Sequence, residues 1–335
     1  MATEVGILGA GGWGTALAKV VAEKGEHVTL WCHGEESFRA IVESRENRIY
    51  LPGARLPENV VATRSLDHAV AGKSLLVCAL PSHVVREVIS RVAHQVSAET
   101  MVLCATKGLE EGSLKTMGAL LLDLFGAERK SRHAFLSGPT FASEVARGLP
   151  AAVTVAACDD AVARTVQQVF STLSLRVYTS SDIIGVQMGG VVKNVIAIAA
   201  GISDGLELGQ NARAALITRG LAEMTRLAER MGADPRTLAG LPGLGDLILT
   251  CAGDLSRNRQ VGLKIAAGKS REEITGSTPM IAEGVRNTRS LFALAKRLEV
   301  EMPIVEQMYE VLYDGKRPME AVQDIMQRSI KAEAG

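Results

Sequence analysis

The sequence predicts an α/β protein, in which an N-terminal domain built on a mostly parallel sheet is followed by an all-helical C-terminal domain. Short β-rich runs alternate with helical patterns through the first half of the chain, which is typical of βαβ units. After Ser181 these runs stop, and apolar residues recur at three- and four-residue spacing. The 335 residues also correspond to roughly two domains of about 150 residues each. We expect the domains at residues 1–180 and 181–335.

The first domain is expected to hold eight strands. Runs such as Leu75–Leu80 are apolar without alternation, which is typical of strands that helices cover on both faces. The expected strands are Val5–Leu8, Val28–Cys32, Val60–Thr63, Leu75–Leu80, Met101–Ala105, Ala134–Ser137, Ala152–Ala156 and Arg176–Tyr178.

Helices are expected between these strands, beginning with Thr15–Glu23, and throughout the second domain. Three prolines in the second domain, Pro235, Pro303 and Pro318, indicate helix starts, because proline fits the first helical position. A further helix is expected at Gln260–Ala267.

Composition excludes several classes of function. The 37 Lys and Arg residues balance the 37 Asp and Glu residues, so neither a nucleic acid nor an anionic membrane surface is an expected partner. No membrane span is expected, because apolar runs such as 191–202 are interrupted by Lys193 and Asn194. The first residues lack the basic and apolar regions of a secretory signal, so we expect a cytoplasmic protein. Five scattered cysteines without a C-x-x-C pair predict neither a disulfide framework nor a metal site.

The sharpest local signal is the G-x-G-x-x-G pattern of residues 9–14, placed between the first strand and the first helix. Gly9 permits the tight turn, Gly11 lets the backbone approach a pyrophosphate, and Gly14 permits close packing of helix on strand. The pattern predicts a Rossmann-like dinucleotide site, and the alternative is a glycine-rich turn without a ligand. Trp13 is either a cap that faces the cofactor or an ordinary core residue.

The residue that ends the second strand decides between NADP(H) and NAD(H) in this fold, because an acid there binds the ribose 2′-hydroxyl and a cation accepts a 2′-phosphate. Here His33 stands at that place, with Glu35 and Glu36 just beyond. The arrangement favours NADP(H) and leaves NAD(H) open. His33 is alternatively a strand-end histidine without a role.

A dehydrogenase also needs a group that moves a proton, and all six histidines lie in the first domain. Lys193 lies inside an apolar helical stretch of the second domain. Burial disfavours the charged form of a lysine and brings its pKa toward the working pH. The alternative is that Lys193 extends to water from a buried helix. Three nearby glycines, Gly185, Gly189 and Gly190, favour a close approach of a cofactor or a neighbouring backbone.

Two further groups of residues are candidates for the substrate site. Asp246, flanked by glycine, either orients the ammonium of Lys193 or is merely a helix N-cap. Ser256, Arg257 and Asn258 open a helix, and they form either a phosphate receptor or a capped helix with a solvated arginine. Lys107 follows a strand at the carboxyl edge of the sheet, where ligands bind in open α/β folds, although a loop lysine is usually only solvated.

Taken together, these motifs resemble the bacterial-type NAD(P)-dependent glycerol-3-phosphate dehydrogenases, and the resemblance runs nearly from end to end. The motifs that carry it are Gly9-Ala10-Gly11-Gly12-Trp13-Gly14, Lys107-Gly108-Leu109-Glu110, Ser137-Gly138-Pro139-Thr140-Phe141-Ala142, Lys193-Asn194-Val195-Ile196-Ala197, Gly243-Leu244-Gly245-Asp246-Leu247 and Ser256-Arg257-Asn258.

The resemblance implies roles for individual residues. Lys193 is implied as the proton donor and acceptor at the substrate C2 oxygen, with Asp246 supporting it and Lys107 contacting substrate and cofactor. The other implied substrate contacts are Gly138, Thr140, Ser256, Arg257 and Asn258. Beside the glycines of the turn, the implied cofactor contacts are Gly12, Trp13, His33, Tyr50, Lys107, Ala142, Arg257, Ile281 and Glu283. Many relatives have arginine in place of His33.

The implied activity is reversible hydride transfer between NADP(H) or NAD(H) and dihydroxyacetone phosphate, which gives sn-glycerol 3-phosphate for glycerophospholipid synthesis. A cytoplasmic homodimer is implied as the usual form. Two alternatives remain on the sequence. A β-hydroxyacid dehydrogenase combines a similar nucleotide domain with a helical domain and a lysine, and a non-catalytic NADP(H)-sensing protein shares the fold without the chemistry.

Overall fold

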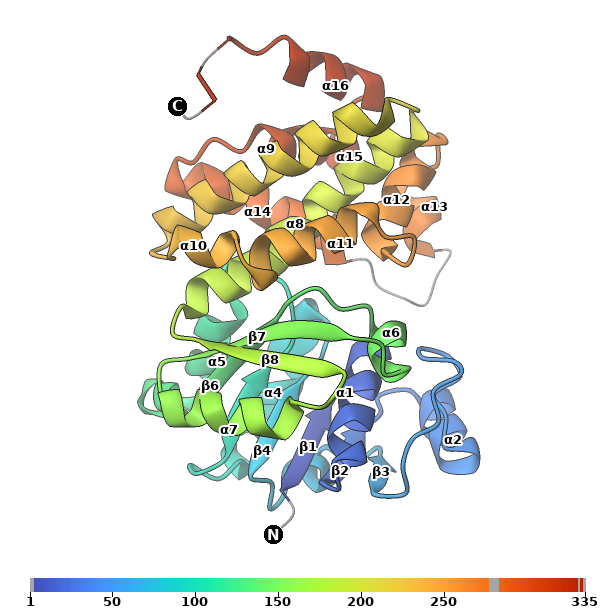
Figure 1. Ribbon diagram of the computed structural model, residues 1–335, viewed down its shortest axis with the longest axis vertical. Coiled ribbons are helices and arrows are strands. Elements are labelled where there is room, and N and C mark those ends of the chain that lie inside the picture. Colours follow the sequence, from blue (N-terminus) through green and yellow to red (C-terminus); the bar gives the residue numbers. More distant parts are fainter. Residues whose placement is uncertain (1–2, 277–282, 331, 334–335) are drawn as a thin grey trace.

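The computed structural model describes residues 3–276, 283–330 and 332–333. It consists of a sheet-containing part that is followed along the chain by a helical part, and Figure 1 shows the two stacked along the long axis of the molecule. The last strand ends at Ser180 and the long helix α8 (Ile183–Gly205) begins three residues later. The change of texture after Ser181 therefore coincides with the end of the sheet.

One eight-stranded sheet forms the first part, in the order β3-β2-β1-β4-β5-β6-β7-β8. The β6–β7 pair is antiparallel and every other pair is parallel, which confirms the predicted α/β class with a mostly parallel sheet. The strands are β1 (Glu4–Leu8), β2 (His27–Trp31), β3 (Val60–Thr63), β4 (Leu75–Cys78), β5 (Met101–Cys104), β6 (His133–Ser137), β7 (Ala151–Ala157) and β8 (Leu175–Ser180). All eight predicted strands are present, with ends that differ by at most two residues.

Helices cover both faces of this sheet, which confirms the predicted sandwich. Along β4, Leu75 and Val77 belong to one core cluster with residues of α1 and α7, whereas Leu76 and Cys78 belong to another with residues of α3, α4 and α5. The helices of this part are α1 (Gly12–Glu23), α2 (Glu35–Ser44), α3 (Leu66–Val70), α4 (Val85–Val92), α5 (Met117–Phe125), α6 (Ala142–Ala146) and α7 (Asp160–Phe170). Helix α1 begins three residues before the predicted Thr15.

Helix α8 is the centre of the helical part, and a third core cluster surrounds it. The other helices are α9 (Gly209–Arg230), α10 (Pro235–Leu238), α11 (Asp246–Ala252), α12 (Arg257–Ala266), α13 (Arg271–Gly276), α14 (Glu283–Leu298), α15 (Pro303–Tyr313) and α16 (Pro318–Met326), with a π-helical turn at Leu241–Gly245. The three proline starts are confirmed. The predicted start of α12 at Gln260 is wrong by one turn, because the Ser256 hydroxyl caps the helix by accepting from the Arg259 N–H at 3.2 Å.

A close approach of two backbones explains one of the α8 glycines. A Cβ added at Gly189 would lie 2.1 Å from the carbonyl oxygen of Pro242, in the turn that leads into α11. The predicted compensation for glycine in this helix is thus a neighbouring backbone. This close approach sets the position of α11 along α8, and therefore the position of Asp246.

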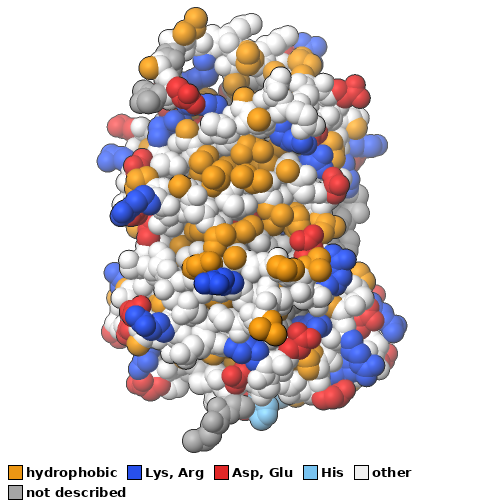
Figure 2. All heavy atoms as spheres, in the orientation of Figure 1, with side chains coloured by type: hydrophobic (Ala, Val, Ile, Leu, Met, Phe, Trp, Pro, Cys, Tyr) orange, Lys and Arg blue, Asp and Glu red, His pale blue; other side chains and the backbone are white. Residues whose placement is uncertain are grey.

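By length and hydropathy α8 is apolar enough to span a membrane, in contrast to the expectation from its interrupted sequence. Its apolar window is 83% buried inside the protein, among the other helices and against β6. Figure 2 shows hydrophobic side chains gathered on one face of the helical part, around α9, α10 and α11.

Candidate active site

The glycine-rich turn between β1 and α1 has the geometry that a dinucleotide requires. Gly9 has φ +115°, a value that favours glycine, and a Cβ added at Gly14 would lie 1.9 Å from the Gly9 carbonyl oxygen. A Cβ at Gly11 would meet no atom of the described residues within 4 Å, so these residues leave the turn open at the position predicted to face the pyrophosphate. The turn therefore fits the group, with the N–H groups of α1 directed toward it.

Two of the other predicted cofactor residues lie beside this turn. A Cβ added at Gly12 would lie 2.9 Å from the Tyr50 carbonyl oxygen and 3.7 Å from Ala142 Cβ. The Asn47 side chain holds the glycine-rich turn in place by donating from Nδ2 to the Ala10 carbonyl oxygen at 2.8 Å. The turn, Tyr50 and Ala142 are thus brought together around the start of α1.

Trp13 and His33 lie differently. The half-buried Trp13 ring packs against two core clusters, and Figure 1 places its helix α1 against the sheet. His33 is exposed directly after β2, as predicted for the end of this strand. Ile281 lies outside the described residues.

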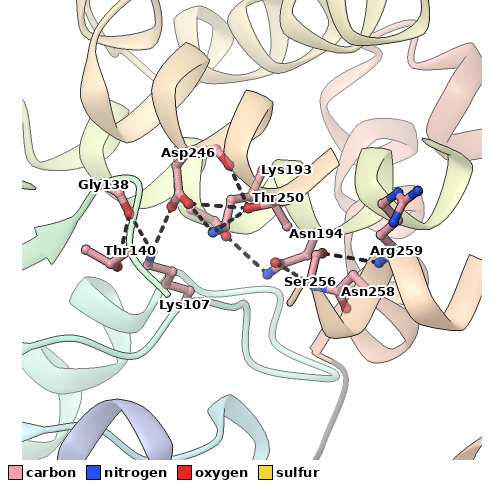
Figure 3. A network of polar contacts seen from close by, with 11 residues as sticks. Lys107, Gly138, Thr140, Lys193, Asn194, Asp246, Thr250, Ser256, Asn258 and Arg259 are labelled. Atoms are coloured by element: carbon pink, nitrogen blue, oxygen red, sulfur yellow. Dashed lines mark hydrogen bonds and ion pairs between the residues drawn. The ribbon is translucent and has the colours of Figure 1, made fainter. Parts of the chain in front are cut away.

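The candidate acid–base centre is a carboxylate shared by two lysines from different parts of the chain (Figure 3). Lys193 on α8 donates to Asp246 Oδ1, and Lys107, in the loop after β5, donates to Asp246 Oδ2 at 2.7 Å. Lys193 is 6% exposed and Asp246 is fully buried. Two alternatives from the sequence are therefore wrong: Lys193 does not extend to water, and the N-cap of α11 is Gly245 rather than Asp246.

The electrostatics of this centre suit proton transfer near neutral pH. Burial lowers the pKa of Lys193 to about 8, against the opposing effect of the Asp246 carboxylate and with a smaller lowering effect of the Lys107 ammonium. An amine with this pKa exchanges a proton readily in either direction. The two lysines and one carboxylate also leave a net positive charge, which would stabilise negative charge on a substrate oxygen.

The loop after β6 adds backbone and hydroxyl groups beside Lys107 (Figure 3). The Gly138 carbonyl accepts from Lys107 Nζ at 3.3 Å and from the Thr140 hydroxyl at 3.3 Å. Both predicted residues of this loop are thus close to the lysine pair.

The start of α12 is held against α8 by a chain of amides. Asn258 donates from Nδ2 to Asn194 Oδ1 at 2.8 Å, and its Oδ1 accepts from the Gly284 N–H at 3.0 Å. Ser256 is buried at the N-cap, and Arg257 is exposed at the first helical position. The start of α12 is therefore fixed against Asn194, the residue that directly follows Lys193 on α8.

Glu283 connects the helical part to the sheet part. It accepts from the Ser82 N–H at 3.0 Å and from the Ser82 hydroxyl at 2.7 Å, just beyond the carboxyl end of β4. This predicted cofactor residue thus lies at the carboxyl edge of the sheet, beyond the end of β4, the strand next to β1.

Two further residues of the network, Thr250 and Asn194, are not among those predicted from the sequence. Thr250 accepts from Lys193 Nζ at 3.1 Å and donates to the Asp246 carbonyl at 2.6 Å. Its signal was the four-residue spacing from Asp246, which places both on one face of α11. Asn194 directly follows Lys193 and had no signal of its own, because its role depends on α12 packing against α8.

Comparison with known proteins agrees with this geometry. Residues 4–163 match the NAD-dependent glycerol-3-phosphate dehydrogenase N-terminus, and residues 182–323 match the C-terminus of the same family. The chain is 51% identical over 333 residues to the glycerol-3-phosphate dehydrogenase [NAD(P)+] of Geobacter sp. strain M21, covering 99% of each chain.

Two solved structures are similar over the full length. The glycerol-3-phosphate dehydrogenase of Coxiella burnetii has 40% identity and a TM-score of 0.93, covering 98% of this chain and 99% of the other. The enzyme of Saccharomyces cerevisiae has 27% identity and a TM-score of 0.80, covering 98% of this chain and 100% of the other. The resemblance of the sequence motifs is thereby confirmed, and the chain belongs to the NAD-dependent glycerol-3-phosphate dehydrogenase family.

Proposed function

We propose that this chain reversibly reduces dihydroxyacetone phosphate to sn-glycerol 3-phosphate with NADPH or NADH, and so supplies glycerol phosphate for glycerophospholipid synthesis. The observation that carries the proposal is the buried Lys193, held by Asp246 opposite Lys107. Membership of the family supports the substrate. A β-hydroxyacid dehydrogenase and a non-catalytic sensor share the fold but are not supported by the family match.

The nicotinamide cofactor, when bound, supplies or accepts the hydride at the substrate C2 carbon. In our proposal its pyrophosphate lies on the backbone of the glycine-rich turn at the start of α1. The remaining contacts come from the segments after β2 and β5, from Tyr50 and Ala142 beside the turn, and from Arg257 and the α14 start. The proposed cofactor residues are Gly9, Gly11, Gly12, Trp13, Gly14, His33, Tyr50, Lys107, Ala142, Arg257, Ile281 and Glu283.

Lys193 performs the proton step in this proposal. As hydride adds to C2, the Lys193 ammonium gives a proton to the C2 oxygen, and in the reverse direction the neutral amine takes it back. Asp246 and Thr250 fix the direction of the amine. The Lys107 ammonium, 2.7 Å from the same carboxylate, stabilises the negative charge that develops on the oxygen.

The start of α12 binds the substrate phosphate in this proposal. Arg257 and the free N–H groups of the first helical turn supply positive potential, and the Ser256 hydroxyl has a proton left to donate. Asn258 acts as a positioning residue through its side chain, since both ends of its amide are already hydrogen-bonded. Gly138 and Thr140 close the site beside Lys107.

Substitution of Lys193 tests the proton step. Lys193→Ala should lower kcat for dihydroxyacetone phosphate reduction by about 10²- to 10⁴-fold, the usual contribution of a positioned acid. The assay follows loss of reduced-nicotinamide absorbance, with cofactor binding measured separately by fluorescence. Lys264→Ala removes an exposed lysine from α12 and serves as the matched control. Wild-type turnover in Lys193→Ala would end the assignment.

We also propose the division into a dinucleotide-binding domain at 1–180 and a substrate-binding domain at 181–335, a cytoplasmic location and a homodimer. The apolar face around α9 to α11 supports the dimer. Ile248 on α11 and Leu255 just after this helix are each about half exposed. Light scattering on the purified chain tests the dimer, and a single 35.5 kDa species would contradict it.

A further inference from the structure

The carboxyl ends of β2 and β3 carry a cluster of charges that the proposed reaction does not use. Arg64 directly follows β3, the strand that pairs with β2 at the sheet edge. Its guanidinium donates to Glu35 and, at 3.3 Å, to the His33 carbonyl. Its backbone carbonyl accepts from the Trp31 indole N–H at 3.1 Å. The Arg64 backbone therefore bonds to β2, and its side chain bonds to the turn that follows β2, which the adenosine ribose faces in this fold.

Glu35 is the acid that an NADH-binding site would require, but both of its oxygens are engaged. Oε2 accepts from Arg64, and Oε1 accepts from Arg39 Nε at 2.8 Å. These two hydrogen bonds hold the pKa of Glu35 below its ordinary value. A ribose 2′-hydroxyl would therefore have to share this carboxylate with two guanidinium groups, which already neutralise its charge.

The same cluster suits a phosphate. Two arginines face one carboxylate, so the three groups carry a net positive charge, and the Arg64 and Glu35 side chains are each about half exposed. A phosphate at the ribose 2′ position is a stronger partner for guanidinium than one shared carboxylate, because it offers paired oxygens and up to two charges. We propose that Arg64 is a specificity-determining residue that binds the 2′-phosphate and gives this chain a preference for NADPH over NADH.

Glu36 is the competing candidate on the same turn of α2. Within the described part of the chain its side chain is exposed and has no hydrogen bond or ion pair, which leaves it available to a ribose hydroxyl. If Glu36 determined the preference, the site would favour NADH. The two residues therefore predict opposite outcomes for the same measurement.

The inference depends on the proposed cofactor site, and its test uses fragments of the cofactor so that binding is separated from turnover. Calorimetry compares 2′,5′-ADP with 5′-AMP on the full chain. We expect the wild-type protein to bind 2′,5′-ADP at least about 10-fold more tightly, as one charged hydrogen-bond pair provides. Arg64→Ala should weaken 2′,5′-ADP by about 10- to 100-fold and leave 5′-AMP within about 3-fold.

Arg132→Ala is the matched control, because it removes a partly exposed arginine that pairs with Glu99 before the amino end of β6. It should leave both affinities unchanged. Steady-state kinetics should then show the same fall in kcat/KM for NADPH and none for NADH in Arg64→Ala. Equal wild-type affinity for the two fragments, or equal weakening of both by Arg64→Ala, would overturn the proposal. Tight 2′,5′-ADP binding without reduction of dihydroxyacetone phosphate would instead contradict the proposed function alone.

Discussion

Replacing Asp246 by asparagine removes the negative charge from the centre of the acid–base network while preserving its shape. In the wild-type protein the carboxylate accepts from Lys193 and from Lys107. It is also the main influence that raises the pKa of Lys193 against burial. Without it, two ammonium groups would face a neutral amide in a buried site. Lys193 should respond by losing its proton at a lower pH.

The magnitude follows from the hydrogen bond that is lost. A hydrogen bond to a charged group contributes about 1.5–3 kcal/mol, and one pKa unit corresponds to about 1.4 kcal/mol. The pKa of Lys193 should therefore fall from about 8 to roughly 6–7. At pH 7.5 the protonated fraction drops from roughly three quarters to between about 3% and 25%. Protonation alone then lowers the reduction rate by roughly 3- to 25-fold, before any loss of orientation.

The assay is the pH profile of dihydroxyacetone phosphate reduction at saturating cofactor. Reduction needs the ammonium form, so wild-type activity should fall as pH rises through about 8, and oxidation of glycerol 3-phosphate should fall as pH drops below it. In Asp246→Asn the midpoint should move to roughly 6–7, with part of the lost activity regained at lower pH. Asp160→Asn, which removes an exposed acid of α7, is the control and should keep the wild-type profile.

A midpoint that stays near 8 in Asp246→Asn would refute this reasoning, because the charge of Asp246 would then not set the pKa that controls the profile. A uniform loss of activity at every pH with that midpoint would leave Asp246 only a geometric role.

Two further predictions concern stability. Gly189→Ala places a Cβ 2.1 Å from the Pro242 carbonyl oxygen, so it should lower the free energy of unfolding by about 1–3 kcal/mol and also reduce activity. The control Gly34→Ala, whose nearest contact is 3.5 Å away, should change the free energy of unfolding little. Urea denaturation measures both variants, and equal unfolding midpoints would contradict the close approach. Glu223, buried beneath the first N–H groups of α15, has its pKa raised by burial to about 7, so its contribution to stability should be lost as pH rises from about 4.5 through 7. Thermal unfolding at pH 5 and 8 should show a smaller loss in Glu223→Gln than in the wild-type protein, and an identical loss would remove Glu223 as its source.

Hydrophobic pattern was sufficient to place the strands, because buried parallel strands form apolar runs with few alternatives. Strand ends were less certain: the predicted strand Leu75–Leu80 ends at Cys78, and the ladder hydrogen bond of Ala79 to Leu8 is followed closely by Pro81, which has no N–H to donate. The antiparallel direction of β7 had no signal, since a two-residue period is the same in both directions.

The residues of the candidate site could be named from the sequence, whereas the contacts that connect them could not. An apolar helix with one lysine indicates a buried amine, and burial is a property of the local sequence. The partner of that amine lies 53 residues away, and the contact depends on how closely α11 approaches α8. Likewise, the engagement of Glu35 by Arg64 joins residues 29 positions apart through the pairing of two strands. The hydrophobic periodicity of a single helix or strand does not predict contacts of this kind between distant segments.

The sharing of one carboxylate between Lys107 and Lys193 has a consequence for protein engineering. A chimera that joins the nucleotide half of this chain to the helical half of a distant homologue brings together two surfaces that were selected separately. Such a hybrid keeps Lys107 but loses the packing of α11 on α8 that positions its partner Asp246. Recombination must therefore transfer the loop after β5 together with α8 and α11 as a single block.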